Sequence, residues 1–405
     1  MRIHSLGALA KLLCAPTALL VLSACGAGSH TLTPSSPQSQ GCGCGFLYAT
    51  TNTNQILSLK LDSTGVPGTP AQTPGPANSL GITSDGSFLY VSDPDHNALD
   101  SFTLNPNDGT FTPVAGSPFA LNTSSGAPAG ISVTGYSVTK TYLYAGDTNG
   151  NIAAFMVGPA IDNGSTWILQ GNLTPLGGSP YAAGAQPLQL TSWGSPQSLT
   201  DFVYAADFAD PNGGVYAFSV GLDGTLSPVT GSPFVTAPAA GPSGIVSSGI
   251  WLYVALHNTN QIAAFTAAGN GALTPLPGSP YAAGNGPSSL ITYGNFLYAL
   301  NDVDHSISAY SMDPNTGMLT AVSGSPFSAG SAFGGLATYL PGPNYSGPGF
   351  LYAPDPAANG FRAFSVDPIA GSLKPLAGSP FPAGSSPMAI TVVGFPGQPL
   401  GIDPP

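Results

Sequence analysis

The residues of this chain that could carry out acid–base chemistry are its aspartates and histidines. Four of the 18 aspartates and two of the five histidines lie in two short segments, Asp93-Pro94-Asp95-His96-Asn97 and Asp302-Val303-Asp304-His305. A carboxylate beside an imidazole can serve as general acid and general base. The adjacent pairs Asp95 with His96 and Asp304 with His305 are therefore candidates for catalysis, although adjacent residues on a strand point to opposite sides.

A second group of aspartates recurs at one position of a repeat. Asp93, Asp147, Asp207 and Asp355 each stand three residues after a repeated Tyr. This recurrence favours a structural role, because Asp side chains hydrogen-bond their own backbone in turns. Two alternatives stay open: a hard cation such as Ca²⁺ held by these oxygens, and catalysis by the Asp–His pairs. The full set of candidate ligand-face residues is Asp93, Asp95, His96, Asp147, Asp207, His257, Asp302, Asp304, His305, Asp355 and Arg362.

The repeated Tyr ends a short apolar run that occurs seven times. The seven Tyr residues lie 42 to 60 residues apart. A self-similar period near 50 residues is typical of radial or solenoid arrays. The seven runs are Phe46-Leu47-Tyr48, Phe88-Leu89-Tyr90, Tyr142-Leu143-Tyr144, Phe202-Val203-Tyr204, Trp251-Leu252-Tyr253, Phe296-Leu297-Tyr298 and Phe350-Leu351-Tyr352.

Each unit contains four strand-like segments separated by turn residues. A small apolar segment precedes the Tyr run, an alternating segment such as Ile262-Ala263-Ala264-Phe265 follows it, and a fourth segment leads into Gly-Ser-Pro-aromatic. Asp-Gly and Asn-Gly pairs between the third and fourth segments are typical of hairpins. Four strands in each of seven units predict an all-β, seven-bladed β-propeller. The unpaired segment Met388 to Val393 is expected to complete the first blade beside Tyr48 and close the ring.

In such a ring the turns between second and third strands share a face with the crossings between blades. The aspartates and histidines above are expected on that face. The first strands, which line the axis, contain no His, Asp, Lys or Arg. They offer Ser, Thr, Gln189 and the ends of Tyr293 and Tyr339. Ser243, Ser288 and Ser289 are expected in ordinary turns, and no catalytic residue can be assigned from a motif.

The N-terminal segment has the pattern of a targeting signal. Arg2 and Lys11 flank an apolar run, and Leu22-Ser23-Ala24-Cys25 resembles a bacterial lipobox in which Cys25 carries the lipid. We expect a signal peptide over 1–24, a flexible Gly/Ser/Pro tether over 25–45, the propeller over 46–394 and a tail over 395–405. Cys42 and Cys44 are expected to form a disulfide or an intermolecular link. Gly26 after the lipidated Cys resembles an outer-membrane sorting signal, which places the protein in the bacterial cell envelope.

The excess of acidic over basic residues limits the classes of partner that this chain can bind. The cations after Cys25 are Lys60, Lys140, Arg362 and Lys374, against 18 acids that are all Asp. Such a chain has no basic patch for nucleic acid or for an anionic lipid surface. The partners expected are therefore the membrane through the lipid on Cys25, and a carbohydrate, peptide or protein ligand. The chain is expected to be a monomer, and no cofactor is implied apart from the Ca²⁺ alternative.

The repeat motifs identify a family resemblance. The Leu-Tyr runs, segments such as Asp223-Gly224-Thr225-Leu226 and Thr316-Gly317-Met318-Leu319, and the Gly-Ser-Pro-aromatic signature resemble the lactonase-type seven-bladed propellers over about residues 46–394. That family includes bacterial propeller 6-phosphogluconolactonases, whose chemistry is tied to Arg, His and Glu around the funnel. This chain has no Glu. We therefore expect a tethered binding or scaffold module, with a lactone-opening hydrolase as the alternative.

Overall fold

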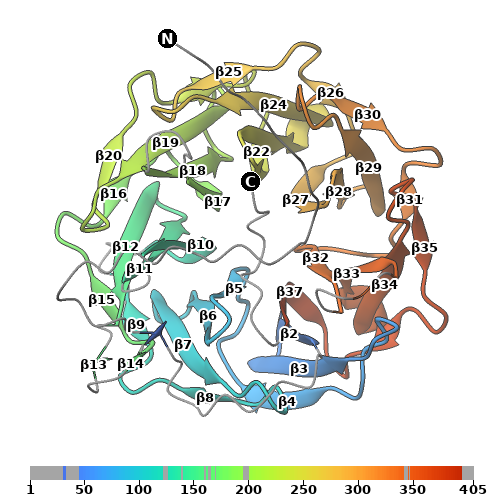
Figure 1. Cartoon of the computed structure of the whole chain (residues 1–405), viewed down its shortest axis with the longest axis horizontal. Helices are drawn as coiled ribbons and strands as arrows, with labels where there is room; N and C mark the ends of the chain where they lie inside the picture. Colours follow the sequence, from blue (N-terminus) through green and yellow to red (C-terminus); the bar gives the residue numbers. More distant parts are fainter. Residues whose placement is uncertain are drawn as a thin grey trace, which may run out of the picture.

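Seven small antiparallel sheets stand around one central axis in the computed structural model of the chain (Figure 1). The structure describes residues 31–32, 45–121, 126–137, 140–158, 161–162, 166–168, 170–194, 200–341, 345 and 347–394. Over these residues the helical segments are two three-residue 3-10 turns, η1 (His257–Thr259) and η2 (Pro356–Ala358). The seven-bladed β-propeller predicted from the repeat is confirmed.

Each blade runs from an inner strand at the axis to an outer strand at the rim, and in blades 2 to 7 the outer strand is broken in two. Blade 1 is β37 (Pro387–Gly394), β2 (Gly45–Thr51), β3 (Gln55–Leu61) and β4 (Ala71–Pro74). Blade 2 is β5 (Ile82–Ser84), β6 (Phe88–Asp93), β7 (Ala98–Leu104), β8 (Phe111–Pro113) and β9 (Phe119–Ala120). Blade 3 is β10 (Pro128–Ser137), β11 (Lys140–Asp147), β12 (Asn151–Val157), β15 (Leu173–Pro175) and β16 (Tyr181–Ala182).

The other four blades have the same order of strands. Blade 4 is β17 (Pro187–Gly194), β18 (Asp201–Asp207), β19 (Gly214–Val220), β20 (Leu226–Pro228) and β21 (Phe234–Val235). Blade 5 is β22 (Pro242–Ser248), β23 (Trp251–Leu256), β24 (Gln261–Ala267), β25 (Leu273–Pro275) and β26 (Tyr281–Ala282). Blade 6 is β27 (Pro287–Tyr293), β28 (Phe296–Asn301), β29 (Ser306–Met312), β30 (Leu319–Ala321) and β31 (Phe327–Ser328). Blade 7 is β32 (Ala337–Tyr339), β33 (Gly349–Asp355), β34 (Gly360–Val366), β35 (Leu373–Pro375) and β36 (Phe381–Pro382).

The ring closes as the sequence predicts. The last strand, β37, pairs antiparallel with β2, with Gly394 opposite Gly45 at one end and Pro387 opposite Thr51 at the other. Blade 1 is thus built from both ends of the propeller. A second link joins blade 7 to blade 1, because the hydroxyl of Tyr352 in blade 7 donates to the carbonyl of Gly65 in blade 1 at 2.7 Å.

The repeated Tyr has a structural reason to recur. A buried phenol needs a hydrogen-bond acceptor, and in six blades the Tyr hydroxyl donates to a Gly carbonyl in the hairpin between the third and fourth strands of the next blade, at 2.7–3.1 Å. Tyr90 is the exception and donates to Asp85 in its own blade at 2.9 Å. Together with apolar clusters between neighbouring blades, these bonds fasten each blade to the next.

The Gly-Ser-Pro-aromatic signature refines the expected fourth strand, which is broken in two. In blade 2, β8 pairs with one end of β7 and β9 pairs with the other. The break leaves one N–H of the third strand without a strand partner, and the Ser of the signature accepts from it. This bond recurs in six blades at 2.8–3.0 Å, with Ser117, Ser179, Ser232, Ser279, Ser325 and Ser379 as acceptors.

An additional small sheet lies outside the ring. The longest interval between repeated Tyr residues contains a hairpin of β13 (Ile161–Asp162) and β14 (Thr166–Ile168), inserted between β12 and β15. The two-residue strand β1 (Thr31–Leu32) pairs parallel with β14. Within the expected tether over 25–45, Thr31 and Leu32 thus form a short strand. The predicted functional cysteines, Cys25, Cys42 and Cys44, lie outside the described residues. The same holds for the predicted signal peptide over 1–24 and the tail over 395–405.

Candidate functional site

The turns between second and third strands share a face with the crossings between blades, as expected. On this face, hereafter the crossing face, the backbone N–H groups of Phe208, His257 and Asp302 donate to the carbonyls of Gln186, Gly241 and Gly286, each just before an inner strand. The hairpins between third and fourth strands lie at the opposite ends of the strands, on what we call the hairpin face. The Asp, His and Arg candidates of the sequence analysis therefore lie on the crossing face, distributed over blades 2 to 7.

The aspartates that follow the repeated Tyr by three residues shape their turns. Asp147 accepts from the backbone N–H groups of Asn149 and Asn151 at 2.9 and 2.8 Å. Asp207 is fully buried and accepts from the N–H groups of Ala185 and Gln186 at 2.7 and 2.6 Å, which ties its turn to the crossing that leads into β17. Asp355 accepts from Ala358 N–H at 3.2 Å in η2. These contacts agree with the prediction that the recurring Asp residues have a structural role in turns.

The Asp–His pairs differ from those expected. His96 contacts Asp93 through Nδ1 at 2.6 Å, and not its neighbour Asp95. This contact raises the pKa of His96, whose side chain is 72% exposed. Asp304 accepts instead from Ser306 Oγ and Asn285 N–H, and the structure gives it no contact with His305. Neither Asp95 with His96 nor Asp304 with His305 is therefore a hydrogen-bonded pair in the structure.

The structure instead pairs residues from two blades. Nδ1 of His257 in blade 5 lies 3.7 Å from Oδ1 of Asp302 in blade 6. The two side chains are 26% and 15% exposed, and Oδ1 of Asp302 is buried with no hydrogen-bond partner in the structure. Burial raises the pKa of Asp302, against the opposing effects of His257 and of a hydrogen bond with Ser288. Unlike Asp207, Asp302 therefore has a carboxylate oxygen that makes no hydrogen bond within its turn.

His257 and Asp302 occupy the same repeat position. Each stands four residues after the repeated Tyr, and Phe208 holds this position in blade 4. Consecutive blades therefore place Phe208, His257 and Asp302 side by side, and the rings of Phe208 and His257 meet edge to face at 5.8 Å. The contact between His257 and Asp302 was not predicted. Aligning the seven repeats on their Tyr residues would have placed Phe208, His257 and Asp302 at the same repeat position.

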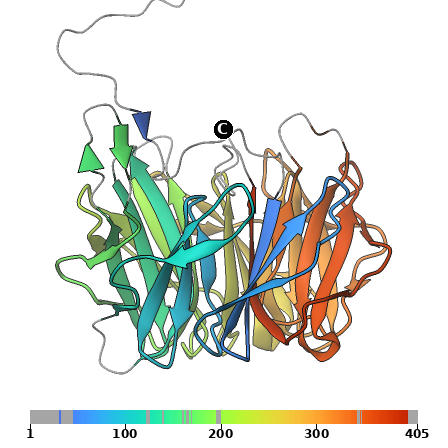
Figure 2. The ribbon, with the colours of Figure 1, turned by 90° about the horizontal axis from the view of Figure 1, so that it is seen from below.

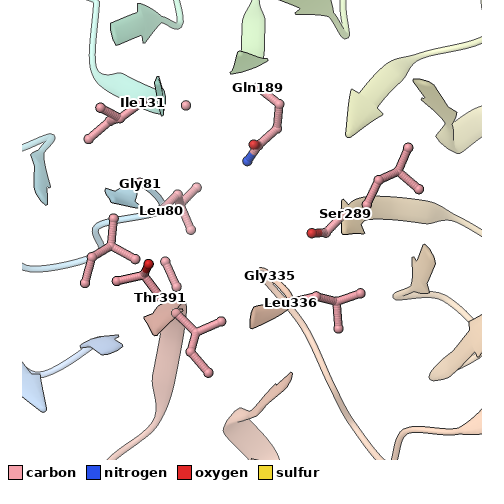
Figure 3. Close-up of a pocket in the computed structure, with 14 residues that line it drawn as sticks. Leu80, Gly81, Ile131, Gln189, Ser289, Gly335, Leu336 and Thr391 are labelled. Atoms are coloured by element: carbon pink, nitrogen blue, oxygen red, sulfur yellow. The ribbon is translucent and has the colours of Figure 1, made fainter. Parts of the chain in front are cut away.

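The axis holds a cavity of about 210 Å³ next to this row. The inner ends of six blades line it, and all of its lining side chains are uncharged. Gln189 of β17 and Ser289 of β27 point toward its centre (Figure 3). Thr391 of β37 also contributes to its wall. The cavity adjoins the row on the crossing face through β27, where Ser288 contacts Asp302 and Ser289 lines the cavity.

Comparisons with known proteins agree with the fold. Residues 236–333 match the family model described as "Lactonase, 7-bladed beta-propeller". A periplasmic gluconolactonase from Pseudomonas aeruginosa superposes with a TM-score of 0.63 at 18% identity, covering 87% of this chain and 100% of that chain. A Bacteroides uniformis protein, provisionally assigned as a 6-phosphogluconolactonase, gives 0.67 at 17% identity, covering 88% and 100%. Over the matched residues, which span blades 5 and 6, this chain is similar to lactonase-type propellers. No curated protein matches it significantly, and structures this distant in sequence indicate the fold alone.

The two Tyr residues expected at the axis lie elsewhere. Tyr339 is 4% exposed and stacks on Phe350, over Gly45 of blade 1. Tyr293 lies over Gly349 of blade 7, where a Cβ atom would come within 2.1 Å of the ring. Both fill the space between blades at the hairpin face, because the end of each inner strand turns toward the next blade.

The three serines expected in turns lie on inner strands. Ser243 is on β22, and its hydroxyl donates to the carbonyl of Pro287 in the next blade at 2.8 Å. Ser288 and Ser289 are the second and third residues of β27. A serine near the start of an inner strand therefore links neighbouring blades or faces the axis, which places Ser288 and Ser289 within the candidate site.

The cations lie away from the cavity. The Nε of Arg362 donates to Oδ2 of Asp355 at 2.7 Å, and Asp355 is 1% exposed, so the pair is close to neutral. Lys60 and Lys374 lie on β3 and β35, the third and fourth strands of their blades. Among the described residues, no cation lines the cavity.

No metal centre is evident in the part of the chain that the structure describes. There, no group of three His, Cys, Asp or Glu side chains is placed as metal ligands would be. The Ca²⁺ alternative therefore stays a prediction from the sequence. The described residues also contain no helix that is both long and apolar enough to cross a bilayer.

Proposed function

We propose that this protein is a membrane-tethered, extracytoplasmic binding propeller whose ligand is neutral and rich in hydroxyl groups, such as a saccharide. The uncharged axial cavity carries this proposal. Gln189, Ser289 and Thr391 supply amide and hydroxyl groups that can donate and accept hydrogen bonds at its wall. At 210 Å³ it is smaller than the roughly 300–1,000 Å³ of ordinary small-molecule pockets, so it accommodates one ring or chain end.

The surroundings of the cavity support a neutral ligand. Phe208 is half-buried beside His257 and offers an apolar surface for the C–H face of a sugar ring. A phosphate group needs Arg or Lys, and Arg362 is engaged by Asp355. The formal net charge of −12 also opposes an anionic ligand. We further propose that the lipid on Cys25 holds the protein at the outer membrane.

Binding of neutral saccharides tests the proposal. Calorimetric titration of the soluble propeller with a panel of neutral sugars and their phosphorylated forms is expected to show binding by neutral members only. Gln189→Leu should weaken that binding about tenfold, because one hydrogen bond contributes about 0.5–1.5 kcal/mol and about 1.4 kcal/mol is a factor of ten. Gln72→Leu, on the exposed outer strand β4, is the matched control. Preference for phosphorylated sugars, or equal loss in both variants, would contradict the proposal.

The His257–Asp302 pair favours a second candidate function, hydrolysis of a neutral lactone. The similar Pseudomonas aeruginosa protein is a periplasmic gluconolactonase. Here His257 would take a proton from water as the water oxygen attacks the lactone carbonyl, and Asp302 would stabilise the imidazolium. The ring C–O bond then breaks, and the proton passes from His257 to the leaving oxygen. The 3.7 Å separation must shorten for this pair to act.

Lactone hydrolysis decides between the two candidates. We expect turnover of gluconolactone and of its 6-phosphate to stay far below about 10 s⁻¹, the median for enzymes. His257→Ala would then change nothing, and His96→Ala, at an exposed His paired with Asp93, serves as the matched control. If neutral-lactone turnover approaches that median and collapses in His257→Ala but not in His96→Ala, the protein is a hydrolase and the binding proposal fails.

A further inference from the structure

We propose that the short strand β1 fastens the N-terminal tether to the hairpin face, so that the crossing face with its ligand site points away from the membrane. This inference rests on the proposed lipid anchor at Cys25. It concerns a surface that neither the binding nor the hydrolysis proposal uses.

Both ends of the propeller emerge on the hairpin face. The first residue of β2, Gly45, is paired with the last residue of β37, Gly394. The other ends of these strands, Thr51 and Pro387, lie beside the crossings between blades. The candidate site and the chain ends are thus separated by the full length of a strand, about 23 Å for seven residues.

The position of the ends alone does not orient the propeller. Residues 25–45, fully extended, would span about 70 Å. That length exceeds the thickness of the ring several times over, so a free tether would let either face approach the bilayer. A point of attachment close to Cys25 is needed.

Strand β1 supplies that point. Thr31 pairs with Thr166 and Leu32 with Trp167, in parallel register, on the edge of the β13–β14 hairpin. This hairpin is inserted between the third and fourth strands of blade 3, and it stands with β1 (dark blue) above one face of the ring in Figure 2. Only five residues then lie between Cys25 and Thr31, which limits the distance between these two residues to about 20 Å. The hairpin face must therefore lie next to the bilayer.

Charge does not provide an alternative attachment. The hairpins of blades 2, 4, 6 and 7 on this face carry Asp108, Asp223, Asp313 and Asp367. A face of this kind is not attracted to anionic lipid. Its orientation toward the membrane would come from the tether and not from adhesion of the propeller.

Energy transfer to a labelled bilayer tests the orientation. The full-length lipidated protein, with Cys42→Ser and Cys44→Ser, receives one probe cysteine, either Ile369→Cys on the hairpin face or Val303→Cys on the crossing face. These side chains are 91% and 62% exposed. In phosphatidylcholine vesicles with an acceptor lipid, transfer from position 369 is expected to be at least twice that from position 303. Equal transfer, or greater transfer from position 303, would overturn the proposal.

Two variants separate the strand from the anchor. Thr31→Pro with Leu32→Pro removes the N–H groups that β1 can donate, and the difference between the two probes is expected to fall at least by half; an unchanged difference would show that β1 does not orient the ring. An unchanged thermal melt confirms that the propeller itself is intact. Cys25→Ser should release the protein from vesicles and from the membrane fraction of cells. Retention of this variant would refute the anchor, and with it the orientation, but would leave the ligand site untouched.

Discussion

Deleting residues 387–405 is expected to unfold the propeller. The deletion removes β37, the inner strand of blade 1, and with it the buried side chains of Ala389, Ile390, Val392 and Val393. Ile390 and Val392 pack in the cluster shared with blade 7, and Val393 packs in the cluster shared with blade 2. At about 1.5–3 kcal/mol for each large apolar side chain, the loss approaches the roughly 5–15 kcal/mol that stabilises a domain.

The exposed edge makes the deletion worse than the lost contacts alone. Without β37, the whole of β2 presents unpaired N–H and C=O groups, a template for pairing with another chain. We expect aggregation on expression and no cooperative melt. A shorter deletion of residues 395–405 keeps β37 and is the matched control, with an unchanged melting temperature. If both truncated chains melt like the full one, closure of the ring through β37 does not contribute to stability.

The fold was predictable because the repeated Tyr and Ser each make the same contact in six of the seven blades. The Tyr reaches the hairpin of the next blade, and the Ser of Gly-Ser-Pro completes the broken outer strand. Seven copies of one pattern leave few architectures open. The β1–β14–β13 sheet had no such pattern, since two-residue strands carry no readable period. Tyr293 and Tyr339 could not be placed either, because an inner strand's last residue faces the axis or the next blade according to its twist.

The face of the ring on which the candidate site lies was predictable, whereas the side-chain contacts within the site were not. The Asp residues of the turns were placed on the correct face because turn order fixes it. The His257–Asp302 pair depends on how far neighbouring blades rotate about the axis, and no property of either residue alone encodes that rotation. Adjacency in sequence suggested Asp304 with His305, whereas the shared repeat position connects His257 with Asp302 across two blades.

The contrast between two carboxylates gives a further test, in which Asp207→Ala is expected to destabilise the propeller strongly. Asp207 is fully buried and accepts three backbone N–H groups, from Ala185, Gln186 and Ala209. Each buried donor left without an acceptor costs about 1–3 kcal/mol, so the loss of all three acceptor contacts should cost at least about 3 kcal/mol. Denaturant unfolding measures this loss. Ligand binding should also weaken, because the crossing that Asp207 holds leads directly into β17 and Gln189.

Asp302→Ala is expected to behave in the opposite way. Oδ1 of Asp302 has no hydrogen-bond partner in the structure, and burial raises the pKa of the carboxyl. A carboxyl whose pKa is higher in the folded chain favours folding most below its ordinary pKa, and this contribution declines as pH rises through the raised value. The variant should therefore change the free energy of unfolding by less than about 1 kcal/mol at neutral pH. Relative to the wild type, the variant should be more stable at pH 7 than it is at pH 3. Its loss should appear in ligand binding or lactone turnover instead. A large loss of stability in Asp302→Ala, equal to that of Asp207→Ala, would show that Asp302 is one more carboxylate that shapes a turn.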